Sequence, residues 1–299
     1  MENIKLSYDF NDNSAIEPPQ LGFHYVDQGN YQTLPLVSGQ PLTIYSDSAT
    51  SCIITLVLSQ KGEESFISLA HLDSPSCIQA FFDIIAAMDA DTYQVTAQGA
   101  NPADNDTSKE NAEQLLACID TLGSKVISSE LSILQGDPRV DNRGDFGLSF
   151  DGDQIALATN QPYKLQLFQR DPSCGGQTVY CIMRRQEQPP IQIRNASLPF
   201  THAELVELAS IAIQFRKDPS DPNSAFTNIV NLESDEIRQA WSTTPEYEAP
   251  WFSDQLKLGA AFAIAMAPVV SLSELHLNKS TPPSFSRLKS AVLSQPIKE

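Results

Sequence analysis

The sequence has no long uninterrupted apolar run and few positive charges. Its longest apolar stretch, residues 258–270, spans 13 of the 299 residues and contains Pro268, so it is too short to cross a bilayer as a helix. Only 19 Lys and Arg stand against 37 Asp and Glu, which gives a formal net charge of −18. Because contacts to phosphate need clustered basic side chains, this balance argues against nucleic acid or a membrane as a partner.

Cysteine and histidine are also sparse. The five cysteines form no C-x-x-C pair, and the four histidines form no H-x-x-x-H pair. We therefore expect neither a disulfide framework nor a metal site, and no cofactor. The first five residues, Met1-Glu-Asn-Ile-Lys5, lack the basic start and apolar segment of a secretory signal. Together these features predict a cytoplasmic protein in a reducing compartment.

The middle of the chain has the pattern of a β-rich region. With 41% apolar and 19% charged residues, the composition is that of a globular protein. Two helices are expected, at 76–88 and at 107–122, where Thr107-Ser-Lys-Glu110 forms a capping box and Gly123 closes the helix. Strands are expected at 42–46, 52–58, 65–71, 92–98, 126–134, 146–150, 154–159, 163–168 and 178–184.

After Ser197 the pattern becomes helical. A second capping box, Thr201-His-Ala-Glu204, precedes an apolar-periodic stretch to Phe215, and further helices are expected at 234–241 and 253–267. The predicted fold class is α+β, with a helical C-terminal portion packed on a β-rich unit. Residues 1–195 and 196–299 would then be two domains, with one compact unit as the alternative.

Two apolar runs predict a hairpin that carries the chemistry. Residues 52–58 and 65–71 flank a polar stretch that contains Gly62. A turn at Lys61-Gly62 makes the numbers of paired residues sum to 123, which puts Cys52 directly across from His71. Cross-strand partners share a face, with Cβ atoms about 4.5–5.5 Å apart. A thiol beside an imidazole is the arrangement of an activated cysteine nucleophile; the alternative is that both residues are structural.

The approach to Cys52 is small, polar and rich in hydroxyl groups. Residues 46–51 read Ser-Asp-Ser-Ala-Thr-Ser. Such a segment suits the exposure of backbone N–H groups near the thiol. The alternative is an ordinary loop stabilised by Ser and Thr turns.

The segments around Cys52 and His71 resemble those of the protein N-terminal asparagine amidohydrolases. Residues 46–52, Ser-Asp-Ser-Ala-Thr-Ser-Cys, are similar to the family's Ser-Asp-Asp-Ala-Thr-Thr-Cys, and residues 70–73, Ala-His-Leu-Asp, to its Thr-His-Cys-Asp. Segments 146–158 and 235–252 are similar to later parts of the family, so the resemblance covers about two thirds of the chain. Residues 1–40 do not align, and Ser48, Ala70 and Leu72 depart from the pattern.

The resemblance implies a fold and a reaction. The fold would be β-sandwich-like, as in bacterial glutamine deamidases, with its Cys–His pair in the domain of residues 1–195. The reaction would convert an N-terminal Asn of a protein or peptide to Asp with release of ammonia, as in an N-degron pathway. Cys52 would be the nucleophile and His71 the general acid and base, and Ser46 would orient the imidazole.

Selection of a free N-terminal Asn also requires recognition of the α-ammonium. A carboxylate beside the pocket can do this, because a desolvated ammonium needs a charged partner. Asp47 and Asp73 flank Cys52 and His71 and are the candidates, with solvated loop charges as the alternative. Thr50 and Ser51 complete the expected substrate-binding set, next to the backbone N–H groups that would hold the oxyanion.

Two other functions stay open at this point. The chain could be a deamidase of internal glutamines in a partner protein, which needs the same nucleophilic pair but no recognition of the α-ammonium. It could also be a non-catalytic β-sandwich module that binds a partner.

Overall fold

The computed structural model describes residues 15–135, 144–157, 163–173, 175–184, 191–201, 204 and 229–266. Within these ranges lie two mixed β-sheets and six α-helices, which confirms the α+β class. No helix in this part of the chain is long and apolar enough to cross a membrane. The stretch expected to be helical after Glu204, up to Phe215, lies outside the described residues, although Thr201 and Glu204 make both hydrogen bonds of the capping box.

The strands form one four-stranded and one six-stranded sheet. The smaller sheet has the order β1 (Phe23–Tyr25), β3 (Leu42–Ser46), β8 (Phe146–Phe150) and β9 (Ile155–Leu157). The larger has the order β10 (Arg194–Asn195), β2 (Asn30–Pro35), β5 (Glu64–Leu72), β4 (Ile53–Lys61), β6 (Thr92–Gly99) and β7 (Val126–Ile133). The pairs β1–β3, β10–β2 and β6–β7 are parallel, and the other pairs are antiparallel.

The two sheets pack face to face, which makes the core β-sandwich-like. Side chains from both sheets share one buried cluster: Ile44, Ile54, Leu56, Ile67, Leu69, Phe146, Leu148 and Phe150. Successive side chains of a strand point to opposite faces. The even-numbered apolar residues of β4 and the odd-numbered ones of β5 therefore face the smaller sheet.

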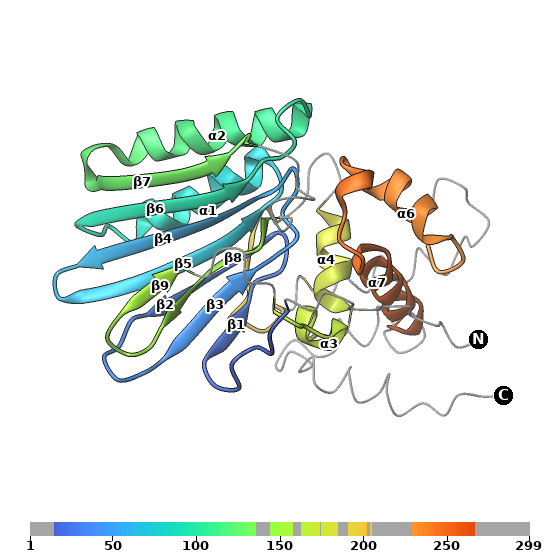
Figure 1. Ribbon diagram of the computed structural model, residues 1–299, viewed down its shortest axis with the longest axis horizontal. Helices are drawn as coiled ribbons and strands as arrows, with labels where there is room; N and C mark the ends of the chain where they lie inside the picture. The colour runs from blue at the N-terminus through green and yellow to red at the C-terminus, as the bar shows by residue number, and fades with distance from the viewer. Residues whose placement is uncertain are drawn as a thin grey trace.

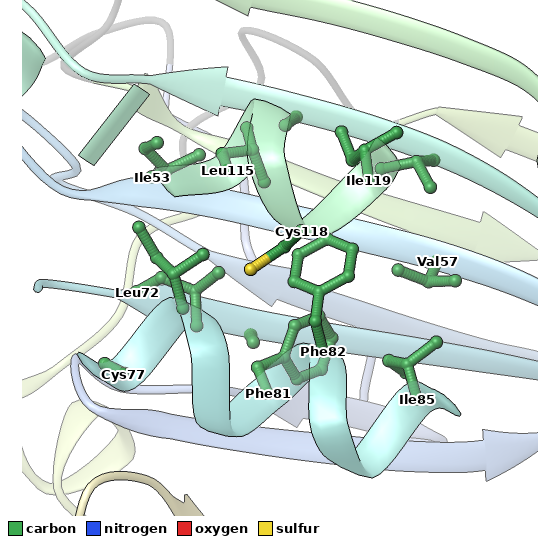
Figure 2. Packing of buried hydrophobic residues seen from close by; sticks show 14 of the residues in the cluster. Ile53, Val57, Leu72, Cys77, Phe81, Phe82, Ile85, Leu115, Cys118 and Ile119 are labelled. Atoms are coloured by element: carbon green, nitrogen blue, oxygen red, sulfur yellow. The ribbon is translucent and has the colours of Figure 1, made fainter. Parts of the chain in front are cut away.

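The opposite face of the larger sheet is covered by α1 (Pro75–Ala87) and α2 (Asp106–Leu122) (Figure 1). In Figure 2, Val57 of β4 lies toward the ring of Phe82 of α1, and Ile53 of β4 lies toward Leu115 of α2. Buried residues of α1 recur at a spacing of three to four, as a helix with one apolar face requires: Cys77, Ile78, Phe81, Phe82 and Ile85. Full burial of one such aromatic side chain stabilises the fold by about 1.5–3 kcal/mol.

The remaining helices gather at one end of the sheets, on the right of Figure 1. They are α3 (Leu167–Arg170), α4 (Gly176–Met183), α6 (Ser234–Trp241) and α7 (Phe252–Met266), with the short 3-10 helix η3 (Pro245–Tyr247) between the last two; another, η1 (Gly123–Lys125), follows α2. Apolar residues of α4, α6 and α7 share a buried cluster. The helices expected at 234–241 and 253–267 are thus confirmed, while the domain boundary near residue 195 stays a prediction.

Three local predictions are wrong. The expected strand at 178–184 is the helix α4, and the one at 163–168 overlaps the start of α3. The β-branched run beginning at Thr178 favours a strand, but the Asp171 carboxylate accepts hydrogen bonds from the first-turn N–H groups of Gln177 and Thr178 and so caps a helix. Helix α2 begins at Asp106, and its N-cap is Asn105 and not Thr107. The Asn105 side chain accepts a hydrogen bond from the Ser108 N–H.

Candidate active site

The β4–β5 hairpin has a register two residues away from the expected one. Ile54, and not Cys52, lies across from His71, and the loop consists of residues 62 and 63. Gly62 has φ +58° and takes the first loop position. A Lys61-Gly62 loop would have placed a lysine there, at a backbone angle that L-residues avoid. The prediction of direct pairing is therefore wrong.

A shift of two residues nevertheless keeps every side chain on its face. Cys52 immediately precedes β4, is half-buried, and packs against the cluster between the two sheets. It therefore lies diagonally from His71 on the same side of the larger sheet. Both residues line one cavity of about 680 Å³ at the end of the sheets. The structure thus brings the expected thiol and imidazole to the same cavity wall.

The hydrogen bonds of Ser46 fix which ring nitrogen of His71 carries the proton. Ser46 Oγ lies 2.6 Å from the Val26 carbonyl oxygen and 2.9 Å from His71 Nδ1. A carbonyl only accepts, so the single hydroxyl proton of Ser46 must go to Val26. His71 Nδ1–H then donates to Ser46 Oγ, which leaves the lone pair of the neutral ring on Nε2.

His71 Nε2 is buried and has no hydrogen-bond partner among the described residues. Burial lowers the pKa of His71 to about 4, and the nearby Asp73 and Asp47 carboxylates only partly oppose this effect. The imidazole is therefore neutral near pH 7, with its basic nitrogen available. A neutral histidine of this kind can take a proton from a thiol.

The backbone at Cys52 and just before it is bonded to the residues that follow β6. The carbonyl of Thr50 accepts from Asn101 N and that of Cys52 from Ala100 N, each at 2.8 Å. Gly99 permits this approach: a Cβ there would lie 2.2 Å from the Cys52 carbonyl oxygen, and its φ is +133°. The neighbouring strand thus holds the loop that presents the thiol.

The hydroxyl groups of Thr50 and Ser51 are bonded to the segment before η3. Thr50 Oγ1 lies 2.7 Å from Thr244 Oγ1, and Ser51 Oγ lies 2.8 Å from Thr243 Oγ1. Both residues line the cavity, as predicted for substrate-binding residues. Their side chains, however, bond to another part of the chain, so any contact with substrate would come from their backbone.

Asp47 is part of a buried ion pair. Its carboxylate pairs with Arg170 and accepts a hydrogen bond of 3.0 Å from the Tyr25 hydroxyl. The guanidinium of Arg170 lies 3.7 Å from the ring centroid of Trp251, a cation–π contact. Asp47 lines the cavity, but its charge is already compensated.

Asp73 is paired in the same way. Its two oxygens lie 3.0 and 3.2 Å from the guanidinium nitrogens of Arg184, and Gln28 donates to it as well. Burial alone would raise the pKa of Asp73, but Arg184 outweighs it and the pKa is lowered. Asp47 and Asp73 were the expected partners of the substrate's α-ammonium. In the structure, both carboxylates already have arginine partners.

Several residues of the site carried no signal in the sequence. Arg170 and Arg184 lie more than 100 positions from the acids they neutralise, and Arg184 fell within an expected strand. Asp27 had no neighbouring motif, and Trp251, although it lies in the segment 235–252 that resembles the family, was not expected at the site. The other cavity wall comes from α6, α7 and the segments on either side of η3, and includes Trp241, Ser242, Glu248, Ala249, Trp251, Phe252 and Gln255.

The described residues contain no group of three or more His, Cys, Asp or Glu that could hold a metal ion. A scan against protein-family models found no matching family, and a search of curated proteins found no match to this chain. The resemblance to the asparagine amidohydrolases therefore stays a prediction, and the proposal below depends on the geometry of the site.

Proposed function

We propose that the chain is a cysteine-dependent amidohydrolase that converts a peptide's or protein's N-terminal asparagine to aspartate and releases ammonia. The observation that carries this proposal is the Val26–Ser46–His71 hydrogen-bond chain, which leaves the lone pair of Nε2 without a hydrogen bond from any described residue, in a histidine that lines the same cavity as Cys52. Nucleophile, base and orienting group are the three parts that thiol catalysis needs.

In the first half-reaction, Cys52 attacks the carbon of the side-chain carboxamide. The thiol proton moves to His71 Nε2 as the carbon–sulfur bond forms, and the carbonyl oxygen becomes an oxyanion. Backbone N–H groups of the loop before Cys52 would stabilise that charge, at about 3–4 kcal/mol per donor. The carbon–nitrogen bond then breaks, and His71 returns its proton to the leaving nitrogen, which departs as ammonia.

In the second half-reaction, water hydrolyses the thioester. His71 Nε2 takes one proton of the water while its oxygen bonds to the acyl carbon, and the carbon–sulfur bond breaks. The proton on His71 then returns to the sulfur. The sum of the two steps is carboxamide plus water to carboxylic acid plus ammonia, and the enzyme ends in its starting state.

The test is release of ammonia from a short peptide that begins with Asn. We expect turnover by the wild-type protein and its loss, by a factor of about 1,000 or more, in Cys52→Ala and in His71→Ala, because each removes a group used in both half-reactions. Cys118→Ala is the matched control, because Cys118 lies in the core between the larger sheet and the helices, away from the cavity (Figure 2). Wild-type protein without turnover, or Cys52→Ala with full turnover, contradicts the proposal.

The two rival functions give different results in the same assay. An internal-glutamine deamidase would release ammonia from a peptide with an internal Gln at a rate that does not depend on the state of its N-terminus. A non-catalytic module would release none from either peptide, and iodoacetamide would label its Cys52 no faster than free cysteine.

A further inference from the structure

One buried acid of the cavity, Asp27, has no positive partner among the residues that the structure describes. Three largely buried acids line the cavity with Cys52 and His71, and two of these, Asp47 and Asp73, each bind an arginine. The third, Asp27, is 6% exposed, and within the described ranges no Lys, Arg or His pairs with it. Its oxygens accept only from neutral donors, Gln28 N at 2.8 Å and Gln255 Nε2 at 3.1 Å.

Asp27 is also held in the wall of the same cavity as the reacting groups. It directly follows Val26, whose carbonyl accepts the hydroxyl proton of Ser46. It lines the large cavity together with Cys52 and His71, and a smaller adjoining one with Gln255. The two hydrogen bonds to Asp27 hold the carboxylate in one orientation, so its position relative to His71 is set before any ligand arrives.

The surroundings of Asp27 disfavour an isolated negative charge. Burial, reinforced by the nearby carboxylate of Asp171, raises the pKa of Asp27 to about 8. Asp171 itself is bonded to the first turn of α4 and supplies no positive charge. A buried carboxylate in such a position is stabilised when a cation enters and supplies the missing charge.

We propose that Asp27 binds the α-ammonium of the substrate's N-terminal residue and thereby restricts the enzyme to free N-termini. This inference rests on the proposed function, since it names how that site selects its substrate. It replaces Asp47 and Asp73 in the role expected from the sequence, because a carboxylate paired with arginine has little charge left to offer. Glu248 also lines the cavity, but it is only half-buried and accepts a hydrogen bond from Ser242.

Binding is measured first, in a Cys52→Ala background that leaves the substrate intact. The probes are two short peptides with the same sequence beginning with Asn, one with a free and one with an acetylated N-terminus. We expect the free peptide to bind more tightly and Asp27→Asn to weaken its binding by about 30-fold or more, as loss of a buried charged partner does. Binding of the acetylated peptide should change little.

Asparagine is nearly isosteric with aspartate, and its side-chain carbonyl can still accept from Gln28 N, so the Asp27→Asn variant is expected to fold. If it does not, Asp27→Ser provides the same test. Glu248→Gln is the comparison variant and should keep the preference for the free peptide. The assignment is overturned if the Cys52→Ala protein with Asp27 intact binds the two peptides equally or binds neither. It is also overturned if Asp27→Asn keeps the preference for the free peptide.

Ammonia release by the protein with Cys52 intact separates this inference from the proposed function. Faster turnover of the free than of the acetylated peptide, unchanged in Asp27→Asn, refutes the role of Asp27 and leaves the proposed function in place. Binding that depends on Asp27 without any release of ammonia refutes the deamidase alone. If both proposals hold, kcat/KM for the free peptide falls in Asp27→Asn, chiefly through KM, and the preference over the acetylated peptide disappears.

Discussion

At the residue scale, the chemistry of the site is decided by the direction of one proton. Val26 contributes no side-chain polar group, yet its carbonyl takes the only proton of Ser46 and so makes Ser46 an acceptor toward His71. The tautomer of His71 is thus set by the backbone carbonyl of Val26, the residue that follows β1. The proton on Nδ1 is bonded inside the protein, and the lone pair on Nε2 is left for the thiol.

The burial of His71 also makes the stability of the protein depend on pH. In the unfolded chain its pKa is near 6.5, and in the folded protein it is about 4. Between these values the unfolded state binds the extra proton and the folded state does not, so the free energy of unfolding falls as pH is lowered. Between about pH 7.5 and about pH 5, the free energy of unfolding of the wild-type protein should therefore fall by about 2 kcal/mol more than that of His71→Asn.

Denaturant unfolding of the two proteins across this pH range measures the difference. The side-chain amide introduced by His71→Asn keeps a donor close to the position of Nδ1, so the bond to Ser46 need not be lost. Other groups titrate in both proteins and cancel in the comparison. Parallel stability curves for wild type and variant would show that His71 is not desolvated as the structure indicates.

At the element scale, the position of Cys52, the proposed nucleophile, depends on how closely β6 approaches the start of β4. Gly99→Ala would place a methyl group against the Cys52 carbonyl and force a positive φ on an alanine. We expect a loss of about 1–3 kcal/mol in the free energy of unfolding and a fall in turnover, because the bond from Ala100 N to Cys52 shifts. Chemical denaturation and the ammonia assay report the two effects separately.

Gly62→Ala is the matched control, at the other end of β4. Gly62 also has a positive φ, but a Cβ there would meet nothing within 4 Å. Its replacement should cost about 1 kcal/mol of stability and leave turnover unchanged. Equal loss of turnover in both variants would mean that strain anywhere in the hairpin, and not displacement of Cys52, affects the site.

Elements differ in how far the sequence predicts them. The alternation of β4 and β5 identifies the hairpin and its faces, because that pattern is local and one face is buried. The register depends on which residue takes a positive φ in the turn. The predicted loop, residues 61 and 62, lies one position before the observed loop, residues 62 and 63. Helix α4 was missed because its cap, Asp171, lies outside the run of residues that favoured a strand.

The residues of the candidate site also differ in how far the sequence predicts them. Cys52, His71 and Ser46 lie within 26 residues of one another. The hairpin pattern predicts that Cys52 and His71 share a face, whereas the role of Ser46 beside His71 was expected only from the family resemblance. The arginine partners of Asp47 and Asp73 come from α3 and from the residue after α4. No local pattern specifies such pairs, so which carboxylate stays uncompensated becomes visible only in three dimensions.

At the scale of the whole molecule, the helices at the end of the sheets are joined to the hairpin by polar contacts around the cavity. Gln255 of α7 donates to Asp27, and the hydroxyl groups of Thr50 and Thr244 lie 2.7 Å apart in a buried position. Trp251 stacks on the arginine that neutralises Asp47. We therefore expect the β-rich and helical portions to unfold as one unit, although the sequence also allowed two domains.

Natural probes in the chain allow a direct test of this expectation. The two tryptophans, Trp241 and Trp251, both belong to the helical portion, whereas Cys118 is buried in the core between the larger sheet and its covering helices (Figure 2). Tryptophan fluorescence and pulsed thiol labelling of Cys118, located by mass spectrometry, should therefore give the same urea midpoint. Thr244→Val should lower both midpoints together, because it removes one partner of a buried hydrogen bond that contributes about 1 kcal/mol. A fluorescence midpoint clearly below that of Cys118 would instead mean that the helical portion unfolds alone, and that the cavity wall it provides can open while the hairpin remains folded.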